Sequence, residues 1–265
     1  MKKSAMKMKI DIPLYEKTPD SPLMHCYFPS IRRGDGAVII FSGGGYKTRV
    51  PHEAQPYASA LNEMGISAFI VDYRVFPDRF PSALLDARRA VRLLRDRAEE
   101  FGINPEKIAV MGSSAGGHLA ALVSTYRGAL DHEENDADII SSIPNAQILC
   151  YPVTDIDSHR GSYEVMLGER IEEHESVTPR LLADERTPVA FIWHTSSDKS
   201  VSVCGSYRYA ARLAELGVAV EMHVYPVGGH GAGLGTGVFD KEVVPHIQGW
   251  IDNLKKWLEL YGWVC

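Results

Sequence analysis

The sequence predicts an α/β protein with a mostly parallel central sheet and helices on both of its faces. Short apolar runs rich in Val, Ile, Phe and Ala recur along the chain without polar alternation, which is typical of strands buried on both sides. Segments with apolar residues at helical spacing separate these runs. Because parallel strands need crossover connections, this order indicates that the helices join successive strands of one sheet.

The apolar runs predict six strands along the chain. The run AVIIF at 37–41 and the run SAFIVD at 67–72 are the first two in chain order. The remaining predicted strands cover residues 108–111, 146–151, 189–194 and 218–225.

Helical periodicity predicts five helices between and after these strands. The first has Tyr57, Leu61 and Met64 on one face and is followed by Gly65, a common helix stop. The last keeps Pro245 in its first turn, where proline is tolerated. The helices are expected at residues 54–64, 84–100, 114–126, 206–216 and 244–261.

Length and composition are consistent with a single domain over residues 1–265, with 45% hydrophobic and 23% charged residues. Within it we expect a leading arm with edge strands at 1–30 and a pocket-shaping insertion at 155–185. The net charge of −6 disfavours nucleic acid as a partner, because such a surface repels polyanions. The oligomeric state stays open at this level.

The location of the chain follows from its apolar runs and its cysteines. No apolar run approaches the ~20 residues that span a bilayer, and the lysine-rich start lacks the apolar stretch of an export signal. The four cysteines are far apart and form no CxxC pair, which argues against a disulfide framework and a zinc site. We therefore expect a cytoplasmic chain with free thiols, no membrane partner and no metal.

The segments that follow the strands are where ligands bind in a parallel sheet. After the strand at 37–41 comes Ser42 and then three glycines, which allow backbone N–H groups to turn toward a ligand. After the strand at 108–111 comes Gly112-Ser113-Ser114-Ala115-Gly116, which matches the pattern G-x-S-x-G between a strand and a helix. This pattern predicts Ser114 as a nucleophile on a strained turn, with a helix N-terminus that favours a developing oxyanion.

A serine nucleophile needs a base, and in this arrangement the base follows in the chain. His230 comes directly after the last strand with glycines on both sides, so its imidazole is expected above the end of the sheet. Other histidines fall inside predicted helices or strands or in acidic stretches: His118, His132, His174, His223 and His246.

The acid that orients the base should follow a strand between these two residues. Asp198 lies just past the strand at 189–194, one strand before His230. Asp155 in YPVTD also follows a strand and is a rival. We favour Asp198, and expect Asp155 to belong to the segment that shapes the pocket.

Taken together, these stretches resemble the α/β-hydrolase fold, and within it the esterase/lipase group of acetyl-xylan-esterase-like and other carbohydrate-esterase-like proteins. The resemblance runs from about residue 37 to the end of the chain. It rests on FSGGGY (41–46), DYRVFP (72–77), INPEKIAVMGSSAGGHLAAL (103–122), YPVTD (151–155), HTSSDKSV (194–201) and YPVGGHGAG (225–233).

The resemblance implies Ser114, Asp198 and His230 as a catalytic triad. It implies an oxyanion hole formed by the Ala115 N–H and the glycine loop, at Gly44 and Gly45. Relatives in this group usually have HGGG, whereas Ser42 stands before the glycines here, which leaves open which of residues 43–45 donates. A second departure is Ser202, where relatives often have Pro.

The expected reaction is hydrolysis of a small carboxylic ester through an acyl-enzyme, with a small ester and water as the only partners and no cofactor. The polar segments 46–57 and 155–185 should wall the pocket, which suits an acetylated sugar better than a lipid. Predicted substrate contacts are Tyr46, Arg49, His52 and Ser113, with Glu53 nearby, although Arg49, His52 and Glu53 would also serve to anchor a loop. An amide-cleaving hydrolase on the same triad and a non-catalytic binding protein on this fold are the alternatives.

Overall fold

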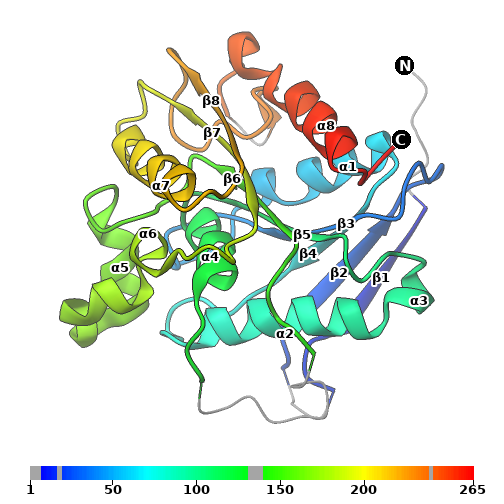
Figure 1. Cartoon of the computed structure of the whole chain (residues 1–265), viewed down its shortest axis with the longest axis horizontal. Helices are drawn as coiled ribbons and strands as arrows, with labels where there is room; N and C mark the ends of the chain where they lie inside the picture. Colours follow the sequence, from blue (N-terminus) through cyan, green and yellow to red (C-terminus); the bar gives the residue numbers. More distant parts are fainter. Residues whose placement is uncertain (1–6, 17–19, 131–139, 239–240) are drawn as a thin grey trace.

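A computed structural model describes residues 7–16, 20–130, 140–238 and 241–265 of the chain (Figure 1). Two of the leading lysines, Lys2 and Lys3, and the histidine His132 lie outside these residues. The strands of the described part form one 8-stranded sheet in the order β1-β2-β4-β3-β5-β6-β7-β8. Their bounds are β1 Lys7–Pro13, β2 Leu23–Phe28, β3 Ala37–Phe41, β4 Ser67–Val71, β5 Ile108–Ser113, β6 Ala146–Cys150, β7 Val189–Thr195 and β8 Val220–Tyr225.

The sheet is parallel except at one edge, where β1 pairs with β2 and β2 pairs with β4 in antiparallel fashion. The pairs from β4 through β3, β5, β6 and β7 to β8 are all parallel. The predicted mostly parallel sheet is therefore confirmed, and the six strands expected from apolar runs are β3 to β8. The two antiparallel strands come from the leading segment before residue 30.

The helices also follow the predicted order, with differences at their ends. The longer ones are α1 Gln55–Met64, α2 Ser82–Asp96, α4 Ser114–Thr125, α5 Arg160–Leu167, α7 Val203–Glu215 and α8 Trp250–Leu260. Shorter pieces are α3 Ala98–Phe101, α6 Pro179–Leu182 and the 3₁₀ segments η1 Pro51–Glu53, η3 Gly168–Val177 and η5 Pro245–Ile247.

Two helix predictions need correction. The helix expected at 84–100 is interrupted at Arg97, whose ψ of 21° departs from helical geometry, so it divides into α2 and α3. The last helix begins at Trp250 rather than at 244, because η5 around Pro245 forms a tighter turn. In that turn the Ile247 N–H donates to the Val244 carbonyl three residues before it, at 3.2 Å.

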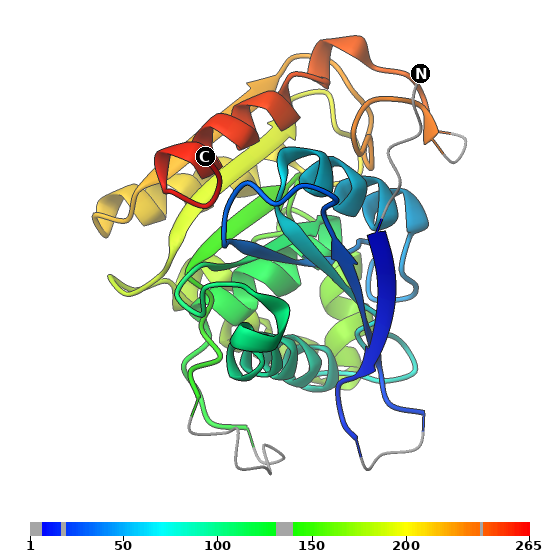
Figure 2. The ribbon, with the colours of Figure 1, turned by 90° about the vertical axis from the view of Figure 1, so that its right-hand side faces the viewer.

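Side chains from alternate positions of each central strand enter two separate cores, one on each face of the sheet. In β3, Ile39 and Phe41 pack into one core while Val38 and Ile40 pack into the other. The first core includes apolar residues of α2, α4 and α7, and the second includes those of α1 and α8. Figure 2 shows α1 and α8 on one side of the sheet and α2 and α4 on the other.

The aromatic stripe of α8 packs inside the second core. The Trp250 ring stacks on Trp193 of β7, with centroids 5.0 Å apart, and Trp257 is also buried. Both tryptophans of α8 therefore face the sheet and not the solvent. The four cysteines are free, with Cys26 and Cys150 buried in the cores.

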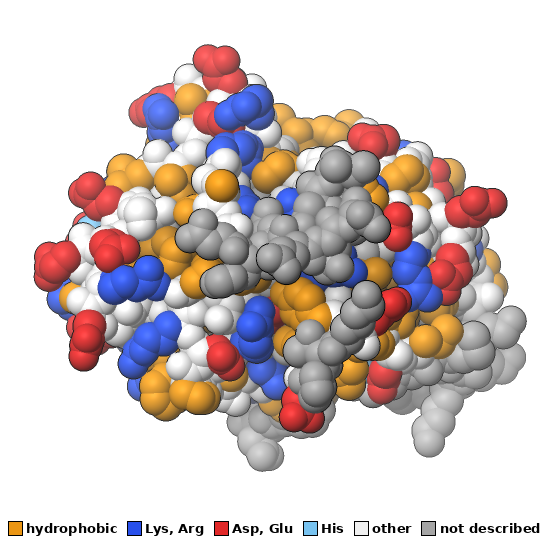
Figure 3. Space-filling model, turned by 90° about the horizontal axis from the view of Figure 1, so that it is seen from below, with side chains coloured by type: hydrophobic (Ala, Val, Ile, Leu, Met, Phe, Trp, Pro, Cys, Tyr) orange, Lys and Arg blue, Asp and Glu red, His pale blue; other side chains and the backbone are white. Residues whose placement is uncertain are grey.

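The surface carries both signs of charge. On the face seen in Figure 3, Lys and Arg side chains lie among Asp and Glu side chains. None of the helices in the described ranges is both long and apolar enough to span a bilayer.

The packing of α4 on the sheet generates a prediction about Gly116. An added Cβ there would overlap the carbonyl oxygen of Phe41 and lie 2.6 Å from that of Ser42, and backbone cannot rotate away. We expect Gly116→Ala to lower the free energy of unfolding by roughly 1–3 kcal/mol, measured by urea denaturation. Gly249→Ala is the matched control, because nothing lies within 4 Å of its added Cβ. Equal stability of the two variants would contradict the close approach of α4.

Candidate active site

Ser114 stands at the junction of β5 and α4, on the turn that the sequence predicts. Its φ of 55° places a non-glycine residue in the left-handed region, where backbone conformation is strained. Small neighbours make this turn possible, since a Cβ on Gly112 would overlap the Gly116 carbonyl. The Ser114 side chain is thereby presented beyond the carboxyl end of the strand.

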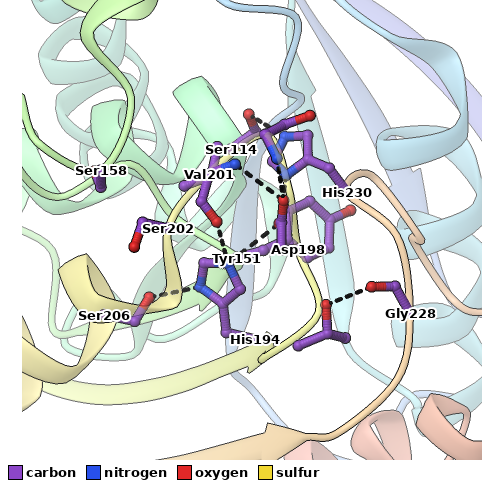
Figure 4. A network of polar contacts seen from close by, with 12 residues as sticks. Ser114, Tyr151, Ser158, His194, Asp198, Val201, Ser202, Ser206, Gly228 and His230 are labelled. Atoms are coloured by element: carbon purple, nitrogen blue, oxygen red, sulfur yellow. Dashed lines mark hydrogen bonds and ion pairs between the residues drawn. The ribbon is translucent and has the colours of Figure 1, made fainter.

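The loops after β7 and β8 bring two distant residues to Ser114. Ser114 Oγ lies 2.8 Å from His230 Nε2, and His230 Nδ1 lies 2.7 Å from Asp198 Oδ2 (Figure 4). The carboxylate accepts a hydrogen bond from Nδ1–H, which leaves Nε2 to accept a hydrogen bond from the serine hydroxyl. The structure thus brings together the three residues singled out from the sequence in a continuous chain of hydrogen bonds.

The side chain of Asp198 is buried, and hydrogen-bond donors lie against both of its oxygens. The N–H groups of Ser200 and Val201 donate to Oδ1 at 2.8 and 2.9 Å. Burial of Asp198 opposes ionisation, but hydrogen bonds from His194 and His230 outweigh it and hold the pKa of the carboxyl well below its usual range. Asp198 is therefore a charged group with a fixed orientation.

His194 is a contact of Asp198 that the sequence reasoning did not single out. It is fully buried in β7, and its Nε2 lies 3.2 Å from Asp198 Oδ2 and 3.2 Å from the Val201 carbonyl oxygen. Its Nδ1 lies 2.8 Å from Ser206 Oγ. Two acceptors at Nε2 indicate that the proton is there. The sequence feature that indicates this contact is the position of His194 at the end of the strand, four residues before Asp198.

Asp155, the rival acid, has other partners. Its carboxylate accepts two hydrogen bonds from Arg208 at 2.8 and 2.9 Å, and one from the Ser158 N–H at 2.9 Å. Arg180 approaches it at 3.5 Å. These contacts join the loop after β6 to α6 and α7, and occupy the carboxylate away from His230.

The glycine loop lies beside Ser114, and one of its N–H groups already has a partner. The Gly43 N–H donates to Glu53 Oε2 at 2.8 Å. Gly44 and Gly45 have φ values of 129° and 63°, which favour glycine, and both line the cavity that contains Ser114. With Gly43 engaged, the candidate oxyanion donors are Gly44, Gly45 and Ala115, the second residue of α4.

Glu53 connects this loop with the loop that carries His230. The carboxylate is buried, and its Oε1 accepts the Tyr151 hydroxyl at 2.8 Å. The Tyr151 oxygen in turn accepts the Gly233 N–H at 3.1 Å. The Tyr151 ring also packs edge-on against His230, with centroids 5.3 Å apart. Loop anchoring, one of the two roles considered for Glu53, is what these contacts provide.

A cavity of about 260 Å³ opens onto Ser114 and His230. Most of its other lining side chains are polar, and three of them, His159, Ser200 and Lys241, were not among the predicted contacts. The lining residues are Gly44, Gly45, Val50, His52, Glu53, Ser114, His159, Ser200, His230, Gly231 and Lys241.

The four predicted substrate contacts are not all placed on this cavity. His52 lines it. Arg49 donates to the Tyr73 carbonyl at 2.7 Å and lines two neighbouring hollows instead. The Tyr46 side chain is buried, with its hydroxyl 2.6 Å from His118 Nδ1.

Ser113 is also buried, because strand alternation turns it away from the side chain of Ser114. Its hydroxyl lies 3.1 Å from that of Tyr57. As for metals, the described residues contain no group of three or more His, Cys, Asp or Glu side chains that could hold an ion.

Known sequences and structures can now be compared with this geometry. The family model described as BD-FAE matches residues 24–213. An acetylxylan esterase of Xylanibacter ruminicola is 29% identical over 87% of this chain and 48% of its own length. Endo-1,4-beta-xylanase B of Butyrivibrio fibrisolvens is 32% identical over 73% of this chain and 32% of its own length. The chain thus spans half or less of these two relatives.

Solved structures match over nearly the whole chain. An acetyl ester-xyloside bifunctional hydrolase from Caldicellulosiruptor lactoaceticus is 36% identical, with a TM-score of 0.87 over 97% of each chain. Esterase 2 of Thermogutta terrifontis, phosphoramylated by tabun, is 25% identical, with a TM-score of 0.83 over 98% of this chain and 97% of its own. Sequence and structure agree that the chain belongs to the BD-FAE family and has the α/β-hydrolase fold of esterases.

Proposed function

We propose that the chain is a carboxylic ester hydrolase that removes small acyl groups, acetyl above all, from polar or carbohydrate alcohols. The observation that carries the proposal is the unbroken chain of hydrogen bonds from Ser114 through His230 to Asp198, at 2.8 and 2.7 Å. The polar side chains of His52, His159 and Ser200 line the cavity onto which Ser114 opens, which supports a polar substrate. Esterase relatives on the same fold support the reaction class.

Acylation begins when His230 Nε2 takes the proton of the Ser114 hydroxyl as Oγ attacks the ester carbonyl. Asp198 stabilises the imidazolium that forms, through its bond to Nδ1. The oxyanion accepts hydrogen bonds from the N–H groups of Ala115 and of Gly44 or Gly45. Each of these bonds stabilises the transition state by roughly 3–4 kcal/mol. His230 then gives its proton to the leaving alcohol oxygen, and Ser114 retains the acyl group.

Deacylation uses the same groups with water in place of the alcohol. His230 takes a proton from water as the water oxygen attacks the acyl carbon. His230 then returns a proton to Ser114 Oγ. The carboxylic acid leaves, and the resting hydrogen bonds form again. Only protein groups and water take part in this scheme.

The names of relatives support an acetyl group and a sugar. One relative is an acetylxylan esterase, and a structural neighbour is an acetyl ester-xyloside hydrolase. The cavity of about 260 Å³ suits a short acyl group better than a long one. A cytoplasmic location stays a prediction from the sequence.

The first test is covalent labelling of Ser114. A fluorophosphonate should label the wild-type protein, and Ser114→Ala should abolish both labelling and hydrolysis of p-nitrophenyl acetate, at least about a thousandfold in kcat. Labelling is measured by the mass of the intact protein. Persistent labelling or activity in Ser114→Ala would contradict the nucleophile, and an unlabelled wild type would favour the non-catalytic binding protein.

A second test separates the two candidate acids. Asp198→Asn removes the charge that stabilises the His230 imidazolium, so we expect kcat to fall by about 10⁴. Asp155→Asn perturbs contacts to Arg208 and should lower kcat by less than about tenfold. Both are measured with p-nitrophenyl acetate on protein whose circular dichroism matches the wild type. A larger loss in Asp155→Asn would assign the acid to Asp155.

A third test addresses the scissile bond and the acyl chain. In a panel of p-nitrophenyl esters, we expect kcat/KM for acetate to exceed that for octanoate by about tenfold or more, since an octanoyl chain is long for a cavity of about 260 Å³. Peptide and formamide substrates serve as the comparison for amide cleavage. Faster turnover of an amide than of the acetate would support the amide-cleaving alternative instead.

A further inference from the structure

We propose that His159 is a specificity-determining residue, whose Nε2–H donates a hydrogen bond to an oxygen on the alcohol part of the substrate. The proposal rests on the ester hydrolase function proposed above. It deepens that function by naming the class of alcohol, which carries hydroxyl or ring oxygens as a sugar does.

His159 lies on the cavity beside the proposed base. It comes from the loop between β6 and α5 and lines the same cavity as Ser114 and His230. Charges on His230 and on Asp198 both act on its ring. Because His230 would protonate the leaving alcohol oxygen, a residue beside His230 faces the alcohol part of the ester. His230 already contacts Ser114, so His159 does not compete for the role of base.

The tautomer of His159 follows from its position at the start of α5. As the N-cap residue it accepts the Ser162 N–H at Nδ1, at 3.1 Å. The Ser162 hydroxyl lies 2.9 Å from the same nitrogen. A nitrogen that accepts from a backbone N–H carries no proton, so in the neutral ring the proton is on Nε2. The helix cap thereby leaves a donor for the cavity.

The ring is also kept neutral. Burial lowers the pKa of His159, and the positive charge of His230 lowers it further. A neutral ring does not repel the His230 imidazolium that forms during the reaction. It also suits a neutral oxygen acceptor, which a hydroxyl-bearing alcohol supplies, and Ser200 adds a further polar group to the same cavity.

The chain allows a variant that separates the cap from the donor. In His159→Asn, the side-chain oxygen can still accept the Ser162 N–H, since Asn is a good N-cap residue, but no group replaces Nε2–H. His174→Asn is the matched control, because His174 belongs to the neighbouring segment η3 and does not line the cavity.

The substrates form a matched pair, a mono-O-acetylated methyl xyloside and cyclohexyl acetate. Both alcohols have a six-membered ring, but the cyclohexyl ring has no ring oxygen and carries no hydroxyl group. Release of acetate is followed by pH-stat titration. We expect His159→Asn to lower kcat/KM for the xyloside ester by about tenfold, mainly through KM, because one neutral hydrogen bond is lost. Turnover of cyclohexyl acetate and p-nitrophenyl acetate should change less than about twofold, and His174→Asn should change none of the three.

Equal losses on the xyloside and cyclohexyl esters would overturn the proposal, since His159 would then support the triad rather than select the alcohol. An unchanged kcat/KM for the xyloside ester in His159→Asn, or the same selective loss in His174→Asn, would overturn it too.

Binding of the xyloside ester to Ser114→Ala protein, titrated by NMR, gives a readout without turnover. There the added His159→Asn change should weaken binding about tenfold, and equal affinity would overturn the proposal. If the wild-type protein hydrolyses none of the esters, the proposed function is wrong. The difference in binding still tests whether His159 contacts the alcohol part of the ligand.

Discussion

The strained backbone at Ser114 is the constraint on which the site depends. A non-glycine residue with a φ of 55° costs of order 1–3 kcal/mol, so the surrounding structure must hold it in place. Here β5, α4 and β3 hold it by packing backbone against backbone. Gly116 lies so close to the carbonyls of Phe41 and Ser42 that an added Cβ would overlap them. The same approach sets the glycine loop after β3 beside the Ser114 side chain and the first turn of α4. The positions of the candidate nucleophile and of the candidate oxyanion donors therefore have one structural cause.

Two buried carboxylates organise the loops around this turn. Asp198 joins the loop after β7 to the one after β8, because it binds His230 together with His194 of the strand and two backbone N–H groups. Glu53 joins the glycine loop to the segment after His230, through Gly43 and Tyr151. A buried charge is stable only where donors surround it, so each carboxylate specifies the positions of its loops. The histidine of the triad lies between the two anchors.

Under the proposed function, chemistry and recognition of the alcohol use different residues at the carboxyl end of the sheet. Ser114, Asp198 and His230 follow β5, β7 and β8, at the carboxyl end of the sheet. The cavity above them is completed by His52 and Glu53 from η1 and by His159 before α5. Under the proposed function, variation at His159 would alter the alcohol that is accepted, whereas Glu53 is needed to hold the glycine loop and the segment after His230.

The sequence by itself predicted the parallel sheet, the order of its elements, and Ser114 and His230 of the candidate triad, with Asp198 favoured over Asp155 as the acid. Those features depend on local patterns: unalternated apolar runs, glycines around Ser114, and polar residues that follow strands. The sequence did not predict the break in the helix at Arg97 or the start of the last helix at Trp250, because each depends on the conformation of a single turn of backbone. Only the tertiary structure decided that Asp198 rather than Asp155 contacts His230, that Tyr46 and Ser113 point into the core, and that Glu53, His159 and His194 surround the triad. Each of these depends on which side chain meets which across loops far apart in the chain, and spacing along the sequence carries no information about that distance.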